Sequence, residues 1–241
     1  MPKPHRTKKE KEISKEFQPL IRGLTSLGPD IQRKKKQFDK RKNPYLACAK
    51  HYFGGDFKSS YSHSFMPFKS YLKLHFLREH FTKYYAWGIP DERVLKEIAK
   101  HSPIVEIGAG TGYWANQLKR HGVDIVAFDS QVEKKGPRWF KVKRGDTTAV
   151  NSHQDRTLFL CWPPYKTSMA YQSLKNYKGS TVIYVGEPDG CTGDEKFRNL
   201  LMSRFIEIKA LPLPKWPGLH DCCFIYKRRS RSKSRRNKKP S

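Results

Sequence analysis

A glycine-rich turn with an acidic residue before it stands near the middle of the chain. Glu106 is followed by glycines at 108, 110 and 112, in an E-x-G-x-G-x-G pattern. Glycines at this spacing form a tight turn and let the backbone approach a bound nucleotide closely. A dinucleotide fingerprint, G-x-G-x-x-G, would need glycine where this chain has Tyr113. The spacing therefore favours another nucleoside cofactor.

A second acidic residue, Asp129, ends the apolar run 125–128 that follows the glycine turn. A carboxylate at the tip of the second strand of such a unit can accept hydrogen bonds from both ribose hydroxyls. Dinucleotides and other nucleoside cofactors share this feature. Asp129 therefore indicates that the cofactor contains a ribose. The glycine spacing distinguishes a dinucleotide from another nucleoside cofactor.

These residues need a strand, a turn and a helix to position them. Residues 104–107 predict a short buried strand and residues 113–120 a helix, while a helix is predicted over 91–100 with apolar residues on one face. Further strands are predicted at 125–128, 140–143, 158–161 and 181–185. Alternating strands and helices predict a mostly parallel sheet, with the ligand crevice at the carboxyl ends of the strands.

Val105–Trp114 resembles the first motif of the class I S-adenosylmethionine-dependent methyltransferases, and Trp162–Tyr165 resembles their fourth. Residues 85–90, 184–194 and 216–221 resemble an uncharacterised subgroup, so that the resemblance spans about residues 84–228. It implies a Rossmann-like α/β fold with a mostly parallel seven-stranded sheet, helices on both faces, S-adenosylmethionine as cofactor and no metal. It also implies these cofactor-binding residues: Trp87, Glu106, Gly108, Ala109, Gly110, Gly112, Tyr113, Asp129, Asp146 and Cys161.

The fourth motif departs from the family pattern at its first residue. Amino-methyltransferases place Asp, Asn or Ser there to accept a hydrogen bond from the target amino group, whereas the Trp162 indole can only donate. Trp162 and Tyr165 could instead stack on a flat target or form a wall of the cofactor pocket.

Titratable residues on later loops are candidate bases or structural turn residues. A hydroxyl acceptor needs a base, whereas an amine does not. Glu187 and Asp194 follow the predicted strand 181–185, and His220 and Asp221 precede the last apolar run. The catalytic candidates are Trp162, Pro163, Pro164, Tyr165, Glu187 and Asp194.

The 241 residues include 49 Lys and Arg against 22 Asp and Glu, a net charge of +27. Residues 1–42 and residues 227–241 each carry +9, and the chain between them carries the other third. Basic arms of this kind neutralise phosphates and release counterions, which predicts a nucleic-acid partner and above all RNA. A solvated tail and a nuclear import signal are the other interpretations of the C-terminal run.

We expect four regions: a basic arm (1–42), an aromatic and basic extension packed on the core (43–83), a methyltransferase domain (84–228) and a disordered basic tail (229–241). Apolar residues between 13 and 24 predict a short helix ending near Gly23 or Gly28-Pro29. Aromatic residues of the extension could stack on bases or fill the core. Cys48 and His51 lack a second ligand pair, which argues against zinc.

No apolar run is long enough to span a membrane, and the N-terminal residues lack the apolar stretch of a secretory signal. An odd number of cysteines indicates reduced thiols and an intracellular protein, for which the tail favours a nuclear or nucleolar address. The resulting prediction is an S-adenosylmethionine-dependent methyltransferase acting on RNA, with room for a protein partner. The alternatives are an inactive methyltransferase fold serving as a nucleic-acid scaffold, and a protein methyltransferase in a ribonucleoprotein.

Overall fold

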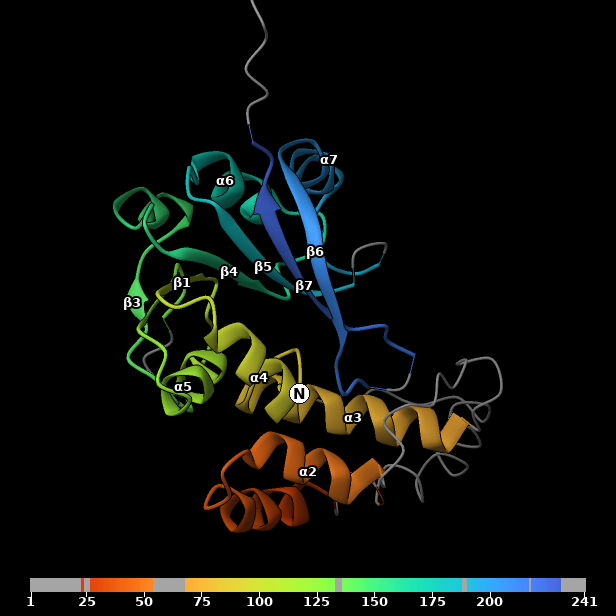
Figure 1. Ribbon diagram of the computed structural model, residues 1–241. Helices are drawn as coiled ribbons and strands as arrows, with labels where there is room; N and C mark the ends of the chain where they lie inside the picture. The colour runs from red at the N-terminus through yellow and green to blue at the C-terminus, as the bar shows by residue number, and fades with distance from the viewer. Residues whose placement is uncertain are drawn as a thin grey trace, which may run out of the picture.

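A twisted seven-stranded sheet runs through the centre of the computed structural model, which describes residues 23, 27–53, 68–132, 136–187, 190–216 and 218–230 (Figure 1). The strand order is β3-β2-β1-β4-β5-β7-β6. Strands β1 to β5 are parallel, and β7 runs antiparallel between β5 and β6. The strands are β1 (Ile104–Ile107), β2 (Ile125–Asp129), β3 (Lys143–Arg144), β4 (Thr157–Cys161), β5 (Thr181–Gly186), β6 (Phe205–Pro212) and β7 (Cys222–Arg228).

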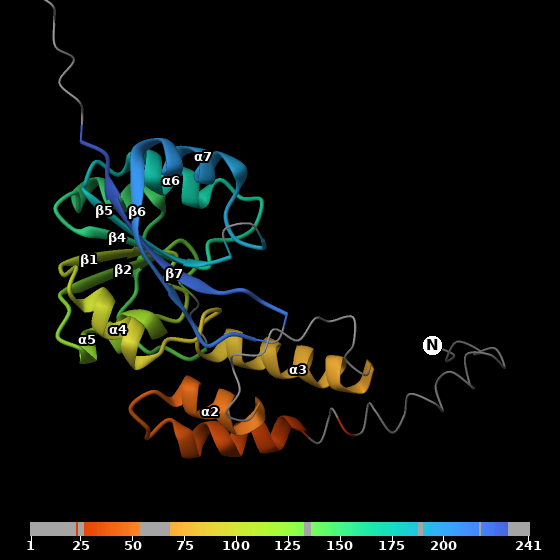
Figure 2. The same cartoon turned by 45° about the vertical axis from the view of Figure 1, so that its right-hand side comes forward.

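Helices cover both faces of the sheet, so the predicted mixed α/β architecture is confirmed (Figure 2). One face carries α4 (Glu92–Ala99) and α5 (Tyr113–Arg120), and the other carries α6 (Met169–Asn176), α7 (Glu195–Arg204) and the 3-10 helix η2 (Thr147–Ser152). Strand β1 shows why two cores form. Ile104 packs into the α4–α5 core, while Val105 and Ile107 pack into the α6–α7 core.

The helix predicted over 91–100 is α4, and its start and its buried face follow from its residues. The Asp91 side chain accepts a hydrogen bond from Val94 N at 2.8 Å and caps the helix. Val94, Leu95 and Ile98 lie on one side and are buried.

The strand predicted at 140–143 is wrong in extent, because only Lys143 and Arg144 pair with β2. The preceding residues lie against the glycine turn instead. Trp139 N donates to Thr111 O at 3.0 Å, and Asn116 Nδ2 donates to Trp139 O at 2.8 Å. These bonds to the turn and to α5 replace the ladder that a longer β3 would make.

Two helices before the sheet, α2 (Pro44–Phe53) and α3 (Phe68–Tyr84), extend the α4–α5 core. Tyr45 is fully buried, stacks on Tyr85 with ring centres 5.0 Å apart, and accepts a hydrogen bond from Trp216 Nε1 at 2.9 Å. Residues from the start and the end of the chain therefore share one core. No helix among the described residues is both long and apolar enough to cross a bilayer.

The basic arm contributes a helix of its own over residues 27–38, and Ile31 from this helix is fully buried. This helix runs through Gly28-Pro29, where the sequence predicts a helix end. Apart from residue 23, the helix predicted between residues 13 and 24 lies outside the described ranges.

Candidate active site

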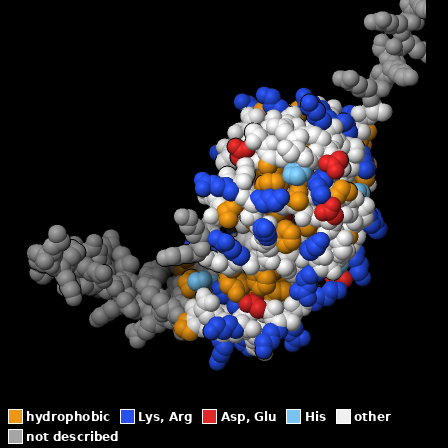
Figure 3. Space-filling view, turned by 90° about the vertical axis from the view of Figure 1, so that its left-hand side faces the viewer, with side chains coloured by type: hydrophobic (Ala, Val, Ile, Leu, Met, Phe, Trp, Pro, Cys, Tyr) orange, Lys and Arg blue, Asp and Glu red, His pale blue; other side chains and the backbone are white. Residues whose placement is uncertain are grey.

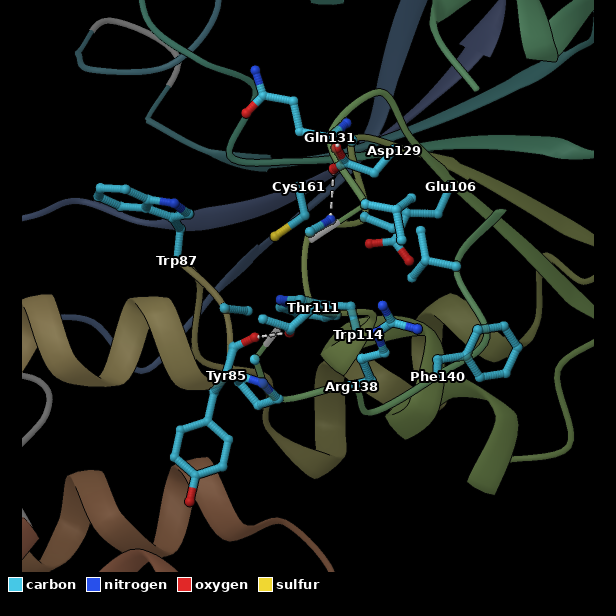
Figure 4. A pocket seen from close by; sticks show the side chains of 18 of the residues that line it. Tyr85, Trp87, Glu106, Thr111, Trp114, Asp129, Gln131, Arg138, Phe140 and Cys161 are labelled. Atoms are coloured by element: carbon cyan, nitrogen blue, oxygen red, sulfur yellow. Dashed lines mark hydrogen bonds between the residues drawn. The ribbon is translucent and has the colours of Figure 1, made fainter. Parts of the chain in front are cut away.

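A cavity of about 600 Å³ opens at the carboxyl ends of β1, β2 and β4 (Figure 4). The end of α3, the glycine turn and the segment before β3 form its other walls. Seven of the ten predicted cofactor-binding residues line it: Trp87, Glu106, Gly108, Ala109, Gly110, Asp129 and Cys161.

The glycine turn presents open backbone to this cavity. Gly110 has a φ of +54°, and a Cβ placed there would meet nothing within 4 Å. Gly112 has a φ of +76°, but its Cβ would lie 2.8 Å from the Cβ of Phe140. Gly110 thus leaves room for a ligand against the backbone, whereas Gly112 is required by the packing of the chain itself.

The Asp129 carboxylate is held in place by two backbone donors. Its Oδ2 accepts from Gly110 N and its Oδ1 from Gln131 N, both at 2.8 Å (Figure 4). A carboxylate offers about four lone-pair positions, so each oxygen retains capacity for a ligand hydroxyl. The arrangement suits a pair of neighbouring hydroxyls such as those of a ribose.

Glu106 also lines the cavity and is only 1% exposed, yet its Oε2 has no hydrogen-bond partner among the described residues. Burial and the nearby charge of Asp129 raise the pKa of Glu106 to about 8, although the backbone of Ala115 lowers it. A buried, unpartnered carboxyl group is unfavourable unless something bonds to it. A cationic ligand group would supply that bond and favour the charged form.

Side-chain hydrogen bonds join the end of α3 and the segment after it to the glycine turn, to α5 and to the segment before β3. The Thr111 hydroxyl donates to Tyr85 O, and Trp139 Nε1 donates to Tyr84 O at 2.8 Å. Trp114 Nε1 donates to Gly88 O at 3.2 Å. The segment after α3 is therefore fixed against the turn.

Of the 21 residues that line the cavity, 14 are absent from the sequence-based site, and four of these show why. Thr111 belongs to the glycine motif itself and could have been included. Tyr85 begins the stretch 85–90 that resembles the subgroup, and Phe140 begins a predicted strand, but neither pattern indicates a place at the cavity. Only the fold brings these two residues and Arg138 there. The four are Tyr85, Thr111, Arg138 and Phe140.

Three predicted cofactor-binding residues lie outside the cavity lining: Gly112, Tyr113 and Asp146. The buried Tyr113 hydroxyl donates to Asn43 Oδ1 at 2.8 Å and accepts from Tyr45 N at 3.0 Å, so it joins α5 to α2. Asp146 is exposed and caps η2 by accepting a hydrogen bond from Thr148 N at 2.8 Å. Hydrogen bonds from the Thr148 hydroxyl and from this backbone N–H lower the pKa of Asp146.

The fourth motif lies beside the cavity, behind an aromatic wall. Trp87 stacks on Trp162 with ring centres 5.5 Å apart and planes 21° from parallel. The guanidinium carbon of Arg78 lies 5.2 Å from the Trp87 ring centre and 5.5 Å from that of Trp162. Trp87 is 50% exposed and Trp162 only 8%, so Trp87 is the member of the pair that a ligand can reach.

The rest of the fourth motif is bonded to the following loop. Gly193 N donates to Pro163 O at 2.9 Å, and Pro164 forms an isolated β-bridge with Thr192. Tyr165 is 50% exposed. Pro163 and Pro164 therefore shape this loop, and Tyr165 faces solvent.

The acidic candidates divide into two structural residues and one without a partner. Asp194 caps α7 by accepting from Phe197 N at 2.8 Å. The buried Glu187 carboxylate accepts from His220 N at 2.5 Å and from Cys191 N at 3.4 Å. Asp221 is 2% exposed, and neither of its carboxylate oxygens has a partner in the described parts of the chain.

No family model matches the chain, and no curated protein matches it. Among solved structures, it is similar to the 1,6-didemethyltoxoflavin-N1-methyltransferase of Burkholderia thailandensis, with 14% identity, a TM-score of 0.45, and coverage of 71% of this chain and 95% of that one. It is also similar to the N-methyltransferase NodS of Bradyrhizobium japonicum (11% identity, TM-score 0.39, 58% and 88% covered). A third is magnesium protoporphyrin IX methyltransferase of Synechocystis (10% identity, TM-score 0.38, 77% and 97% covered). The strand order described above establishes the α/β fold independently of these similarities.

Proposed function

We propose that this protein is an S-adenosylmethionine-dependent methyltransferase. The observation that carries the proposal is the pairing of Glu106 and Asp129 in one cavity beside the open backbone of Gly110. S-adenosylmethionine has an ammonium group for the first carboxylate and a ribose diol for the second. The bound cofactor would supply a methyl group activated by a sulfonium.

The chain's own residues then position two reactants and exclude water. Asp129 would hold the ribose hydroxyls, Glu106 the ammonium group, and Gly110 would let the cofactor lie against the backbone. Trp87 offers an accessible aromatic face at the cavity wall for an acceptor. Alignment of this kind can supply much of the rate of a two-reactant transfer. Burial raises the pKa of the Cys161 thiol well above its usual value, which keeps it protonated and unreactive.

We propose RNA as the acceptor. The net charge of +27 supports it, and so do Lys83, Arg138 and Lys141 in the cavity lining. Lys143 and Arg144 in β3 are exposed next to them. Lys and Arg side chains are spread over the side of the molecule that carries β3 (Figure 3). Such a surface favours a polyanion over a neutral small molecule.

The test combines cofactor binding with transfer of labelled methyl to total RNA, DNA and protein. Asp129→Ala should weaken the binding of S-adenosylhomocysteine at least about tenfold, because each hydrogen bond to a charged group contributes about 1.5–3 kcal/mol. Asp124→Ala is the matched control, since Asp124 precedes β2, is exposed and pairs with Arg156 at 2.9 Å. Label that RNase releases would support an RNA methyltransferase.

Other outcomes would contradict the proposal in separable ways. Absence of S-adenosylhomocysteine binding by the wild-type protein would refute the cofactor. Label released only by protease would replace RNA with a protein acceptor. Binding without label in any pool would favour the inactive scaffold. Deleting residues 231–241, which hold six Lys and Arg, should lower RNA affinity and flatten its salt dependence while cofactor binding stays the same.

A further inference from the structure

The helix over residues 27–38 is followed by a carboxylate that binds two consecutive tyrosines. Asp39, the first residue after this helix, accepts a hydrogen bond from the Tyr84 hydroxyl at 2.7 Å and from the Tyr85 hydroxyl at 2.9 Å. Lys35 of the helix is 4% exposed, and its Nζ lies 4.0 Å from the centre of the Tyr84 ring. The basic arm is therefore bonded to the end of α3, where the chain reaches the cavity.

The same two tyrosines are bonded to the cavity walls through their backbones. Tyr84 O accepts from Trp139 Nε1 at 2.8 Å, and Tyr85 O accepts from the Thr111 hydroxyl of the glycine turn. Figure 4 shows the Tyr85 ring pointing away from the cavity, toward the helices of residues 27–53 at the bottom of the view. Each tyrosine thus has Asp39 at its hydroxyl and a wall of the cavity at its carbonyl.

The cavity walls that meet at these tyrosines also contact one another. Trp139 N donates to Thr111 O at 3.0 Å, and the Trp139 ring stacks on Tyr85 with ring centres 5.3 Å apart. The end of α3, the glycine turn and the segment before β3 are therefore joined into one group. Asp39 connects this group to the basic arm.

The composition of the arm sets Asp39 apart. Residues 31–42 contain seven Lys and Arg and a single acidic residue, which is Asp39. A carboxylate weakens the attraction of such a run for a polyanion. The two tyrosine hydroxyls give this carboxylate a role other than nucleic-acid binding.

A second carboxylate on the same helix makes a similar contact that does not reach the cavity. Asp30 accepts from the Tyr52 hydroxyl at 2.9 Å and from Arg33 at 2.8 Å. Tyr52 belongs to α2 and is absent from the cavity lining. Asp30 therefore joins the helix to α2, whereas Asp39 joins it to residues that shape the cavity.

We propose that Asp39 is a positioning residue of the cofactor site, acting through Tyr84 and Tyr85 on the walls that meet at Thr111. The proposal rests on the proposed function, because this cavity is the one assigned to S-adenosylmethionine. It gives residues 27–39 a role in cofactor binding, although none of them lines the cavity. The apparent affinity of a ligand falls with the fraction of protein whose site has the competent arrangement, and loss of Asp39 should reduce that fraction.

The experiment measures binding of S-adenosylhomocysteine to the full chain by calorimetry. Asp39→Ala should weaken binding about tenfold or more, the effect expected when a hydrogen bond to a charged group is lost. Asp30→Ala is the matched control, because it removes the same kind of bond from the same helix. Its affinity should stay within about twofold of the wild type, as for a site that shares no partner with the cavity.

Hydrogen exchange of the ligand-free protein gives a second readout that does not depend on the cofactor. Amide exchange in residues 108–112 and 136–142 should rise in Asp39→Ala and stay unchanged in Asp30→Ala, because only Asp39 binds the tyrosines that contact these segments. A carboxylate that merely attached the helix would give the same exchange in both variants.

Equal affinity of the two variants, or equal exchange in them, would overturn the role of Asp39. No binding of S-adenosylhomocysteine by the wild-type protein would overturn the cofactor assignment, and the exchange pattern would then decide on Asp39 separately. If Asp39→Ala did not fold, Tyr84→Phe would test the same link. Tyr52→Phe is its control, since each change removes one hydroxyl that is bonded to an acidic residue of the arm.

Discussion

Replacing Glu106 by Gln should weaken cofactor binding and remove its dependence on pH. The pKa of Glu106 lies at about 8 in the free protein against its usual 4.5. This difference corresponds to about 5 kcal/mol between the two protonation states. A cationic ligand group beside the carboxylate favours the charged form, so binding should release the proton.

The expected magnitude follows from the charged fraction. With a pKa of about 8, about 1% of Glu106 is charged at pH 6 and about half at pH 8, so affinity should rise about 50-fold over this range. At pH 7 each binding event should release close to one proton. Glu106→Gln should abolish both the rise and the release.

Calorimetry of S-adenosylhomocysteine between pH 6 and pH 8, in buffers of different ionisation enthalpy, measures the affinity and the proton count together. Asp155→Asn, an exposed acid-to-amide change on the turn before β4, serves as the control. Equal affinity at pH 6 and pH 8, with no proton released, would show that Glu106 does not meet a cationic group of the ligand.

Three further predictions concern stability and the glycine turn. Because the folded-state pKa of Asp221, about 7, lies above its usual 3.8, its stabilising contribution is complete below pH 3.8 and is lost as the pH rises through 7. Urea unfolding should show a fall of about 2–3 kcal/mol between pH 5 and pH 8 that Asp221→Asn lacks, and equal falls in both proteins would contradict this titration. Gly110→Ala should lower cofactor affinity and reduce the free energy of unfolding by about 1–2 kcal/mol. Gly112→Ala should destabilise the protein more, because its Cβ would meet Phe140 at 2.8 Å. Similar melting temperatures of the two variants would refute this distinction. Tyr113→Phe should lower the free energy of unfolding by about 1–3 kcal/mol through lost buried hydrogen bonds and leave cofactor affinity unchanged, so a drop in affinity would place this residue at the ligand.

Local patterns were sufficient to predict most of the sheet and the centre of the cavity. The alternation of apolar strands and helices predicted the parallel strands, since each must bury its own apolar residues. Glu106, Gly110 and Asp129 could be placed at one crevice because the carboxyl ends of neighbouring parallel strands meet there.

Contacts between distant segments could not be predicted in the same way. Tyr113 is adjacent to the glycine motif, but its hydroxyl bonds to Asn43 and to the backbone of Tyr45, about 70 residues earlier. Trp139 and Phe140 have strand-forming side chains, but their bonds and packing attach them to the glycine turn instead. In each case, a tertiary contact decides between two placements that the local residues allow equally.

The central position of β7 has a consequence for the order in which the protein folds. Strands β5 and β6 both leave the ribosome before β7, yet neither pairs with the other, because β7 must enter between them. Until it does, the nascent chain carries two unpaired strand edges, the kind of surface through which chains associate wrongly. Once β7 is in place, Arg228 fixes its C-terminal end by donating hydrogen bonds to Gly179 O at 2.7 Å and to Tyr177 O at 2.9 Å. The strands that hold Glu106 and Asp129 can pair before β7 exists, so the cofactor side of the site can assemble early and Asp221 arrives with the last strand.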